Sequence, residues 1–238
     1  MKKVVWGVLA LLMASSFSLA QSVAFVGKDA NPDDDFTFVA LSQIPNGTVI
    51  FFTNRQWDNT TGSFLDDGEG TIVFTATSII PQGTVTLIVE PNSPGNTFTV
   101  NSDSGGGLGA GLGTAVIAAG SADWSPTSAD PHYAFSASNA SDPFNTITEI
   151  HALMSTLSGG FAASFDPSTG TGASPSAVVV DWATSQAVGI DYNADRTAAT
   201  KATLANPANY LEGSSITLNT AFFSSSGLPV ELQAVTVE

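Results

Sequence analysis

The chain has 238 residues, no cysteine and a formal net charge of −15. Without cysteine there is no disulfide framework, so the fold has to rest on its hydrophobic core. A chain this acidic is repelled by phosphate backbones and by anionic membrane surfaces, which argues against nucleic acid as a partner. Two interpretations of the acidity stay open: solubility of a charged surface, and binding of divalent cations by clustered carboxylates.

Residues 1–20, MKKVVWGVLALLMASSFSLA, have the composition of a secretory signal peptide. Lys2 and Lys3 form the positive start, residues 4–13 form a short apolar run, and small residues before Gln21 suit cleavage. The apolar run is too short to span a bilayer and no second one follows, so we expect no transmembrane segment in the mature chain. Loss of the two lysines leaves 4 of the 6 basic residues against 21 acidic ones, a net charge of −17. We expect a secreted protein or one at the outer cell surface.

Short segments rich in Val, Ile, Phe and Thr alternate with turns built from Asn, Asp, Gly and Pro, which predicts β-strands. Residues 36–41 are apolar on both faces, as in a strand at the centre of a sheet. The matching turns IPNGTV and IPQGTV each lead into a strand and could mark equivalent corners, although two short echoes do not make a repeat. The predicted strands cover residues 23–27, 36–42, 48–53, 71–75, 84–89, 115–119, 132–136, 146–153, 177–182 and 186–190.

These elements predict an all-β fold, an immunoglobulin-like antiparallel β-sandwich over residues 21–223 with long Gly/Ser-rich loops. Residues 91–114 are glycine-rich and are interpreted as a long surface loop or a weakly ordered segment, with a possible soft domain boundary there. Residues 164–176 are the clearest loop. Residues 224–238 are interpreted as a linker and a terminal strand.

One short helix is predicted at the alanine-rich segment Thr197–Leu204. Asp195 or Thr197 can cap its start, Lys201 suits its last turn, and Pro207 lies just beyond its end.

Several of these segments resemble a largely uncharacterised family of secreted bacterial surface proteins, many of them from the Bacteroidetes. The first block of matching motifs is Ala24-Phe25-Val26-Gly27, Asp34-Asp35-Phe36-Thr37-Phe38-Val39, Phe52-Thr53-Asn54-Arg55-Gln56-Trp57 and Gly68-Glu69-Gly70-Thr71. The second is Asp191-Tyr192-Asn193, Thr200-Lys201-Ala202 and Asn206-Pro207-Ala208-Asn209-Tyr210, with Tyr210 where Trp is usual. The likeness is patchy between residues 95 and 185.

The resemblance implies an immunoglobulin-like β-sandwich and an extracellular location, and it implies no established activity. The first block is also similar, more distantly, to lamin-tail-like sandwiches of exported bacterial proteins. The segment Leu228-Pro229-Val230-Glu231-Leu232 resembles the LPVEL segment that precedes type IX secretion sorting domains; the alternative is a simple edge strand.

The best candidate for a metal site is the acidic loop from residue 29 to residue 35. Asp29, Asn31, Asp33 and Asp35 place oxygen atoms at alternating positions, which suits Ca²⁺. It is not an EF-hand, because Asp34 and Ala40 stand where that loop needs Gly and Glu. The alternative is that these residues form turns and caps. Two further acidic groups have the same two interpretations: Asp191, Asn193 and Asp195, and Asp66, Asp67 and Glu69.

The aromatic residues and histidines give weaker signals. Trp57 is either a core residue or an exposed anchor for a sugar or a protein partner, and its large apolar side chain favours the core. Trp124 and Tyr133 lie in polar, turn-rich surroundings and are predicted to be exposed. His132 and His151 are too far apart in sequence to suggest a metal pair, and His151 reads as an ordinary strand residue.

No zincin helix, nucleophile elbow, P-loop or dinucleotide motif occurs, so we expect no enzyme. The sequence favours a secreted structural, adhesion or ligand-display module whose partner is a surface protein or a polysaccharide. The first alternative is a calcium-dependent carbohydrate-binding module. The second is a hydrolase that uses paired carboxylates, which are recognised by their spatial separation. In the sequence the acidic residues gather in polar loops, away from the apolar runs that would raise a pKa.

Overall fold

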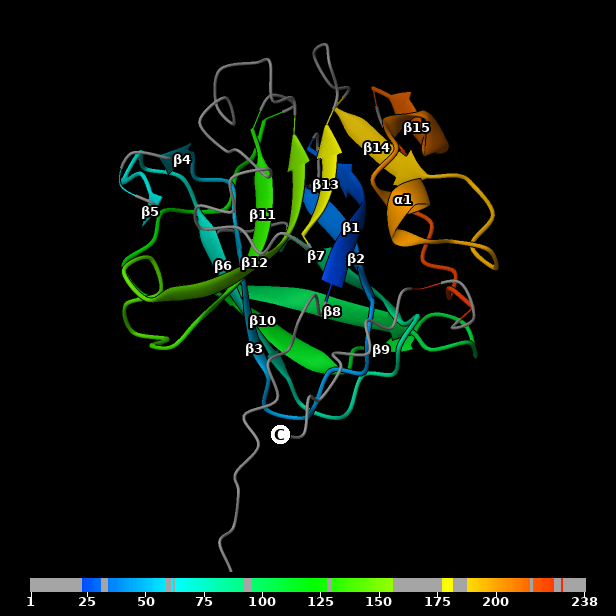
Figure 1. Cartoon of the computed structure of the whole chain (residues 1–238). Helices are drawn as coiled ribbons and strands as arrows, with labels where there is room; N and C mark the ends of the chain where they lie inside the picture. Colours follow the sequence, from blue (N-terminus) through cyan, green and yellow to red (C-terminus); the bar gives the residue numbers. More distant parts are fainter. Residues whose placement is uncertain are drawn as a thin grey trace, which may run out of the picture.

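The protein is described here by a computed structural model, and its described part is nearly all β, as the sequence predicts (Figure 1). No helix of this part is long and apolar enough to cross a membrane. The predicted signal peptide, the loop at 164–176 and the terminal strand lie outside the described residues. These are 23–30, 34–58, 61, 63–91, 96–127, 130–155, 177–181, 188–214, 216–224 and 228.

Most predicted strands are found within a few residues of their expected bounds, while five strands had not been predicted, namely β4, β5, β8, β9 and β15. The strands are β1 (Val23–Asp29), β2 (Asp35–Ala40), β3 (Val49–Thr53), β4 (Trp57–Asp58), β5 (Ser63–Phe64), β6 (Thr71–Ala76), β7 (Val85–Val89), β8 (Thr97–Asp103), β9 (Gly109–Ala110), β10 (Gly113–Ile117), β11 (His132–Ala137), β12 (Ile147–Ser155), β13 (Val178–Asp181), β14 (Gly189–Tyr192) and β15 (Tyr210–Gly213).

Thirteen of these strands form one curled sheet with the order β13-β12-β11-β3-β6-β10-β8-β7-β2-β1-β14-β15, and β9 pairs with β8. The start of β8 pairs with β10 and the rest of it pairs with β7, so β8 carries the sheet from one half of the fold to the other. All named strands pair antiparallel except β12 with β13. As predicted from its two apolar faces, β2 lies inside the sheet, between β7 and β1.

The main core lies between the two halves of this curled sheet. Phe38 of β2 packs against Phe52 of β3 and Phe74 of β6, with ring centroids 5.1 and 5.3 Å apart. Phe25 of β1 also contacts Phe52, at 5.8 Å. Burial of aromatic rings from both halves supplies the hydrophobic stabilisation that a chain without disulfides requires.

A second cluster lies on the other face of β3 and β11. It consists of Phe51, Trp57, Phe64, Tyr133, Phe135, Ile150 and Leu153, all of which are buried. The small β4–β5 hairpin closes this cluster, because Trp57 and Phe64 are cross-strand partners with ring centroids 5.0 Å apart.

The two matching turns of the sequence occupy equivalent corners. Gly47 and Gly83 have φ values of +82° and +83°, which favour glycine. In each turn the N–H of the following threonine donates to the carbonyl of the proline at 3.2 Å. The corners lie side by side, because Ile44 and Ile80 exchange both backbone hydrogen bonds at 2.9 Å.

The expectation of a loop over residues 91–114 is wrong, because β8, β9 and the start of β10 lie there. Two of the glycines, Gly111 and Gly113, have a packing role. A Cβ on Gly111 would lie 2.4 Å from the carbonyl oxygen of Val100, and one on Gly113 would lie 2.4 Å from the ring of Phe74. Glycine therefore marks close contact between neighbouring strands here, which the composition alone does not distinguish from a loop.

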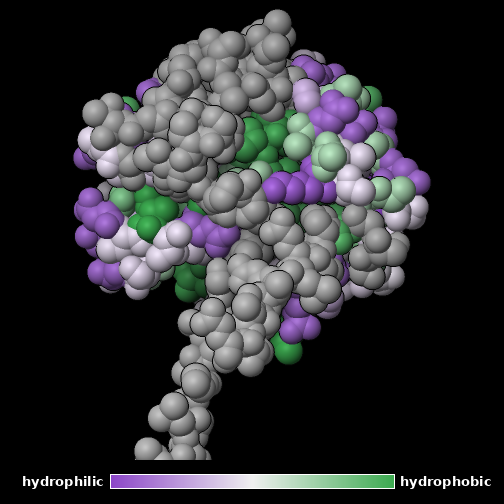
Figure 2. Space-filling model, viewed as in Figure 1, coloured by the Kyte–Doolittle hydropathy of each residue, from purple (hydrophilic) through white to green (hydrophobic). Residues whose placement is uncertain are grey.

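The predicted helix is shorter than expected. Helix α1 covers only Lys201–Leu204, and its N-cap is Thr200, which forms a capping box with Thr203. Asp195 caps a turn instead of a helix, because its carboxylate accepts hydrogen bonds from the N–H and hydroxyl of Thr197 at 2.8 and 2.7 Å. The short 3₁₀ helix η2 (Pro207–Asn209) follows and leads into β15. At the upper right of Figure 2, where α1 and β15 lie in Figure 1, the surface shows both hydrophilic and mildly hydrophobic residues.

Candidate functional site

A surface depression of about 360 Å³ lies among the described residues, and we call it the Arg55 hollow. Its walls come from three places: the ends of β3 and β5, the turn after β10, and the loop between β11 and β12. Its lining residues are Arg55, Phe64, Asp66, Ala118, Ala119, Gly120, Ser121, Ala140, Ser141, Asp142, Pro143, Phe144 and Asn145.

Arg55 is the fixed charged group of this hollow. Its guanidinium lies 4.3 Å from the centroid of the Phe144 ring and 3.1 Å from the carboxylate of Asp66. Its Nε donates to the carbonyl of Glu69 at 3.2 Å, and its Nη1 donates to the carbonyl of Leu65 at 3.4 Å. These contacts hold a mostly buried cation at the wall, while the Asp66 side chain is 92% exposed. An ion pair with so exposed a partner adds little stability, so the arrangement mainly positions Arg55.

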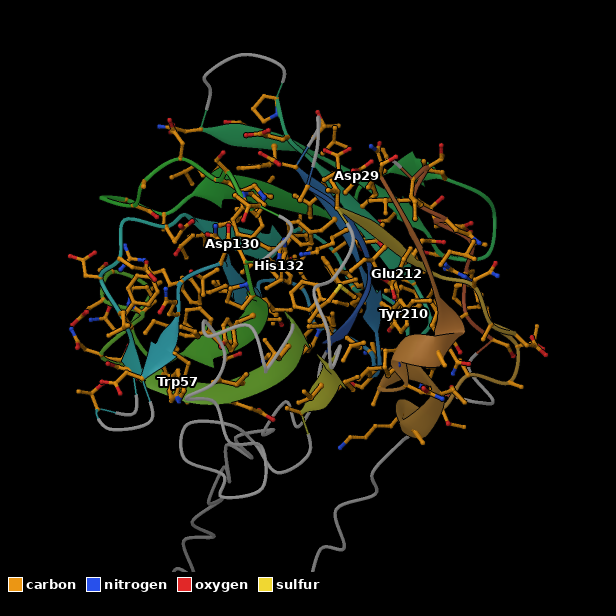
Figure 3. The ribbon with its side chains drawn as sticks, turned by 90° about the horizontal axis from the view of Figure 1, so that it is seen from above. Asp29, Trp57, Asp130, His132, Tyr210 and Glu212 are labelled. Atoms are coloured by element: carbon orange, nitrogen blue, oxygen red, sulfur yellow. The ribbon has the colours of Figure 1, made fainter. Side chains whose placement is uncertain are left out.

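A second polar cluster lies inside the fold and consists of Lys28, Asp130 and His132. All three are buried, and Lys28 has no exposed surface. The Lys28 Nζ donates to the Asp130 main-chain oxygen at 3.4 Å, and His132 Nδ1 lies 3.3 Å from the same oxygen. Figure 3 shows Asp130 and His132 next to each other, well inside the ribbon.

Burial controls the ionisation of this cluster. It lowers the pKa of the Lys28 amine to about 7, although the charge of Asp130 acts in the opposite direction. Burial, and then the charge of Lys28, hold the pKa of His132 well below its usual range. The His132 ring packs edge-on against Trp124 at 5.2 Å, in surroundings that disfavour a charged imidazole.

Asn54 and Glu69 connect this cluster to the Arg55 hollow. The Asn54 side-chain amide donates to the Glu69 carboxylate, and the Asn54 Oδ1 is buried without a hydrogen bond in the described part of the chain. Burial, and then the charges of Asp130 and Asp67, raise the pKa of Glu69, while the Asn54 hydrogen bond opposes this. Glu69 therefore holds a proton more readily than an ordinary surface carboxyl.

The predicted calcium loop is only partly described, because Asn31 and Asp33 lie outside the described residues. Asp29 and Asp35 are cross-strand partners in the β1–β2 hairpin. Each accepts a backbone hydrogen bond: Asp29 from the N–H of Ile216 at 3.3 Å, and Asp35 from the N–H of Glu90 at 2.8 Å. Calcium binding at this loop stays a prediction.

The acidic group around Asp191 also accepts backbone hydrogen bonds. Asp191 accepts one from the N–H of Asn219 at 3.0 Å and lies 3.9 Å from Arg196. Burial raises the Asp191 pKa to about 6. The sequence-based view that acidic residues avoid apolar surroundings is therefore wrong for this residue.

In the third acidic group, Asp67 accepts hydrogen bonds from the N–H of Gln56 at 2.9 Å and of Glu69 at 3.2 Å. These contacts match the interpretation of Asp as a turn former. In the part of the chain that is described, no group of three or more His, Cys, Asp or Glu side chains is arranged to hold a metal ion.

The aromatic predictions give a mixed result. Trp57 is fully buried, as expected for a core residue, and Figure 3 shows it far from Asp29. Trp124 and Tyr133 were expected to be exposed, but both are buried. The indole N–H of Trp124 donates to the carbonyl of Asp34 at 3.0 Å, which lets the ring pack against Phe36 at 5.5 Å. Polar neighbours in the sequence were misleading because the chain folds this segment back over the core.

Sequence reasoning also missed a contact between Ser136 and His151. The Ser136 Oγ lies 2.7 Å from His151 Nε2, and a Glu149 oxygen lies 3.8 Å from His151 Nδ1. A β-bulge produces this arrangement: Ala134 pairs with Ala152 while Phe135 pairs with Ile150, which leaves His151 as the extra residue. Ser136, His151 and Glu149 are arranged in the order of a nucleophile, a base and an acid in a catalytic triad. However, the Glu149 oxygen is beyond hydrogen-bond distance, and burial lowers the His151 pKa to about 4, which makes it a poor base at neutral pH.

The structure thus defines an all-β, sandwich-like domain with a surface hollow and a buried Lys–Asp–His cluster next to it. No family model, curated protein or solved structure matches this chain.

Proposed function

We propose that the protein is a non-catalytic ligand-display or adhesion module that works outside the cell and binds its ligand in the Arg55 hollow. The signal-like segment at residues 1–20 and the strongly acidic composition support an extracellular role. The observation that carries the proposal is the hollow itself, whose walls come from three separate parts of the chain that the β-fold brings together. Loops held by a rigid scaffold are the usual place for binding residues.

The lining groups favour a neutral ligand that is rich in hydroxyl groups. Arg55 is already paired with Asp66 and stacked on Phe144, so its charge is largely used within the protein. Asp66 and Asp142 leave the hollow with a negative balance that disfavours a polyanion. Asn145, whose amide donates to Asp142 at 2.9 Å, and the Asp142 carboxylate offer the donors and acceptors that sugar hydroxyls match. A surface polysaccharide is the partner class that this chemistry supports best.

The test is binding of the mature chain to an immobilised panel of neutral and sulfated oligosaccharides. We expect neutral glycans to be bound, and the double variant Asp142→Ala with Asn145→Ala to bind them at least about tenfold more weakly. The reason is that hydrogen bonds to charged groups contribute about 1.5–3 kcal/mol. Asn193→Ala, at an exposed residue outside the hollow, is the matched control. Unchanged binding by the double variant, or binding of sulfated glycans only, would contradict the proposal.

A further inference from the structure

Lys28 occupies an unusual position for a lysine. It lies on β1, where every residue is buried, and its amine reaches across the fold to the segment that precedes β11. The residue it contacts there, Asp130, is 102 positions further along the chain. Buried lysines lose their charge readily and then act as nucleophiles.

The chemistry of an amide-forming site is present around this contact. With a pKa of about 7, a large share of the Lys28 amines is neutral and carries a free electron pair at neutral pH. The carboxyl of Asp130 is nearly buried and close enough to act on the charge of Lys28. Glu69 is close enough for the charge of Asp130 to raise its pKa, and an acid of raised pKa can carry a proton at neutral pH more readily than an ordinary carboxyl. Aromatic rings of Phe25, Phe36 and Trp124 border the cluster through His132.

We propose that Lys28 and Asp130 join in an intramolecular isopeptide bond that staples β1 to the segment before β11. The neutral Lys28 Nζ attacks the Asp130 side-chain carboxyl carbon in its protonated, uncharged form. Glu69 supplies the proton that this carboxyl needs, then passes a proton from the attacking nitrogen to the departing hydroxyl as the tetrahedral intermediate collapses, and ends as a carboxylate. One C–N bond forms, one C–O bond breaks and one water molecule leaves, so no oxidant, reductant or cofactor is needed.

One local movement is required. The Asp130 Oδ2 accepts a hydrogen bond from the N–H of Thr127 at 2.6 Å, while the Lys28 Nζ contacts the main-chain oxygen of Asp130. The proposed bond requires that the Thr127 hydrogen bond is released and that the Asp130 side chain turns about its Cα–Cβ bond toward the amine. The resulting crosslink would close a long loop of a chain that has no cysteine, which is where a covalent staple restricts the unfolded state most. The bond is independent of what the Arg55 hollow binds.

The decisive measurement is the intact mass of the purified mature chain, followed by tryptic mapping. We expect a mass lower than the sequence mass by one water molecule. Trypsin has four sites in the mature chain, at Lys28, Arg55, Arg196 and Lys201, and it does not cleave after an amide-linked lysine. The map should therefore lack the free fragments 21–28 and 29–55 and show a branched species that joins residues 21–55 to residues 56–196.

Three variants and one control variant sharpen the test. Lys28→Arg and Asp130→Ala should restore the full sequence mass, and Glu69→Gln should leave a large uncrosslinked fraction although both bond partners are present. Lys201→Arg, at a lysine outside the cluster, should keep the crosslink. A wild-type chain of full mass would overturn the proposal even if the variants fail to fold. Loss of water with normal cleavage after Lys28 would overturn it too, because it would show ring closure at an aspartate instead.

Discussion

The buried histidine of the bulge in β12 gives the most quantitative prediction. His151 has no exposed surface, and burial lowers its pKa from about 6.5 to about 4. In the unfolded chain the ring takes up a proton at the ordinary pKa, so acidification favours unfolding as soon as the pH falls below about 6.5. The free energy of unfolding keeps falling until the pH reaches the folded-state pKa near 4. Above pH 6.5 the neutral His151 ring therefore causes no loss of stability.

The size of the effect follows from the shift. A difference of about 2.5 pKa units corresponds to about 3 kcal/mol of unfolding free energy across this window. In a His151→Gln variant this contribution is absent, because glutamine does not titrate. The variant should gain about 3 kcal/mol relative to the wild type on going from pH 7 to pH 4, whatever constant offset the lost ring packing causes.

The assay is urea unfolding followed by tryptophan fluorescence, repeated at half-unit steps between pH 4 and pH 7.5. Trp57 and Trp124 are both buried and report the loss of packing. Asn193→Ala should follow the wild-type profile. A difference between His151→Gln and wild type that stays constant over the whole pH range would refute the reasoning, since it would mean that His151 titrates alike in both states.

Two further predictions concern a carboxylate and the paired corners. Burial raises the Asp191 pKa to about 6, so its contribution to stability is present below pH 3.8 and is lost as the pH rises through 6. After allowance for solvent screening, the unfolding free energy of Asp191→Asn should rise by about 2 kcal/mol relative to wild type between pH 4 and pH 7. Urea unfolding measures this difference, and a fall over the same pH range would contradict the prediction. Gly83→Ala should cost about 3 kcal/mol, because the new Cβ would lie 2.1 Å from the carbonyl oxygen of Phe223 at a positive φ. Gly47→Ala, with the same φ but open space around it, should cost only about 1 kcal/mol, and equal losses in thermal unfolding would show that the Phe223 contact is unimportant.

The sequence by itself determined the local structure. A turn depends on a few adjacent residues. The two Pro-x-Gly corners, the strands that follow them and the all-β class were therefore predicted correctly. The burial of β2 also followed from its sequence, because apolar residues on both faces of a strand require cover on both sides. In these cases the signal and the structure lie within a few neighbouring residues.

The tertiary structure alone decided the sites. Lys28 and Asp130 are 102 residues apart, and nothing local to either one indicates the contact. The burial of Trp124 depends on a fold-back of its segment over the core, and Gly111 and Gly113 depend on strands that pass within van der Waals distance. The position of His151 depends on a one-residue bulge. Side chains alternate between the faces of a strand, so one extra residue changes which face a side chain occupies, and only long-range pairing fixes that register.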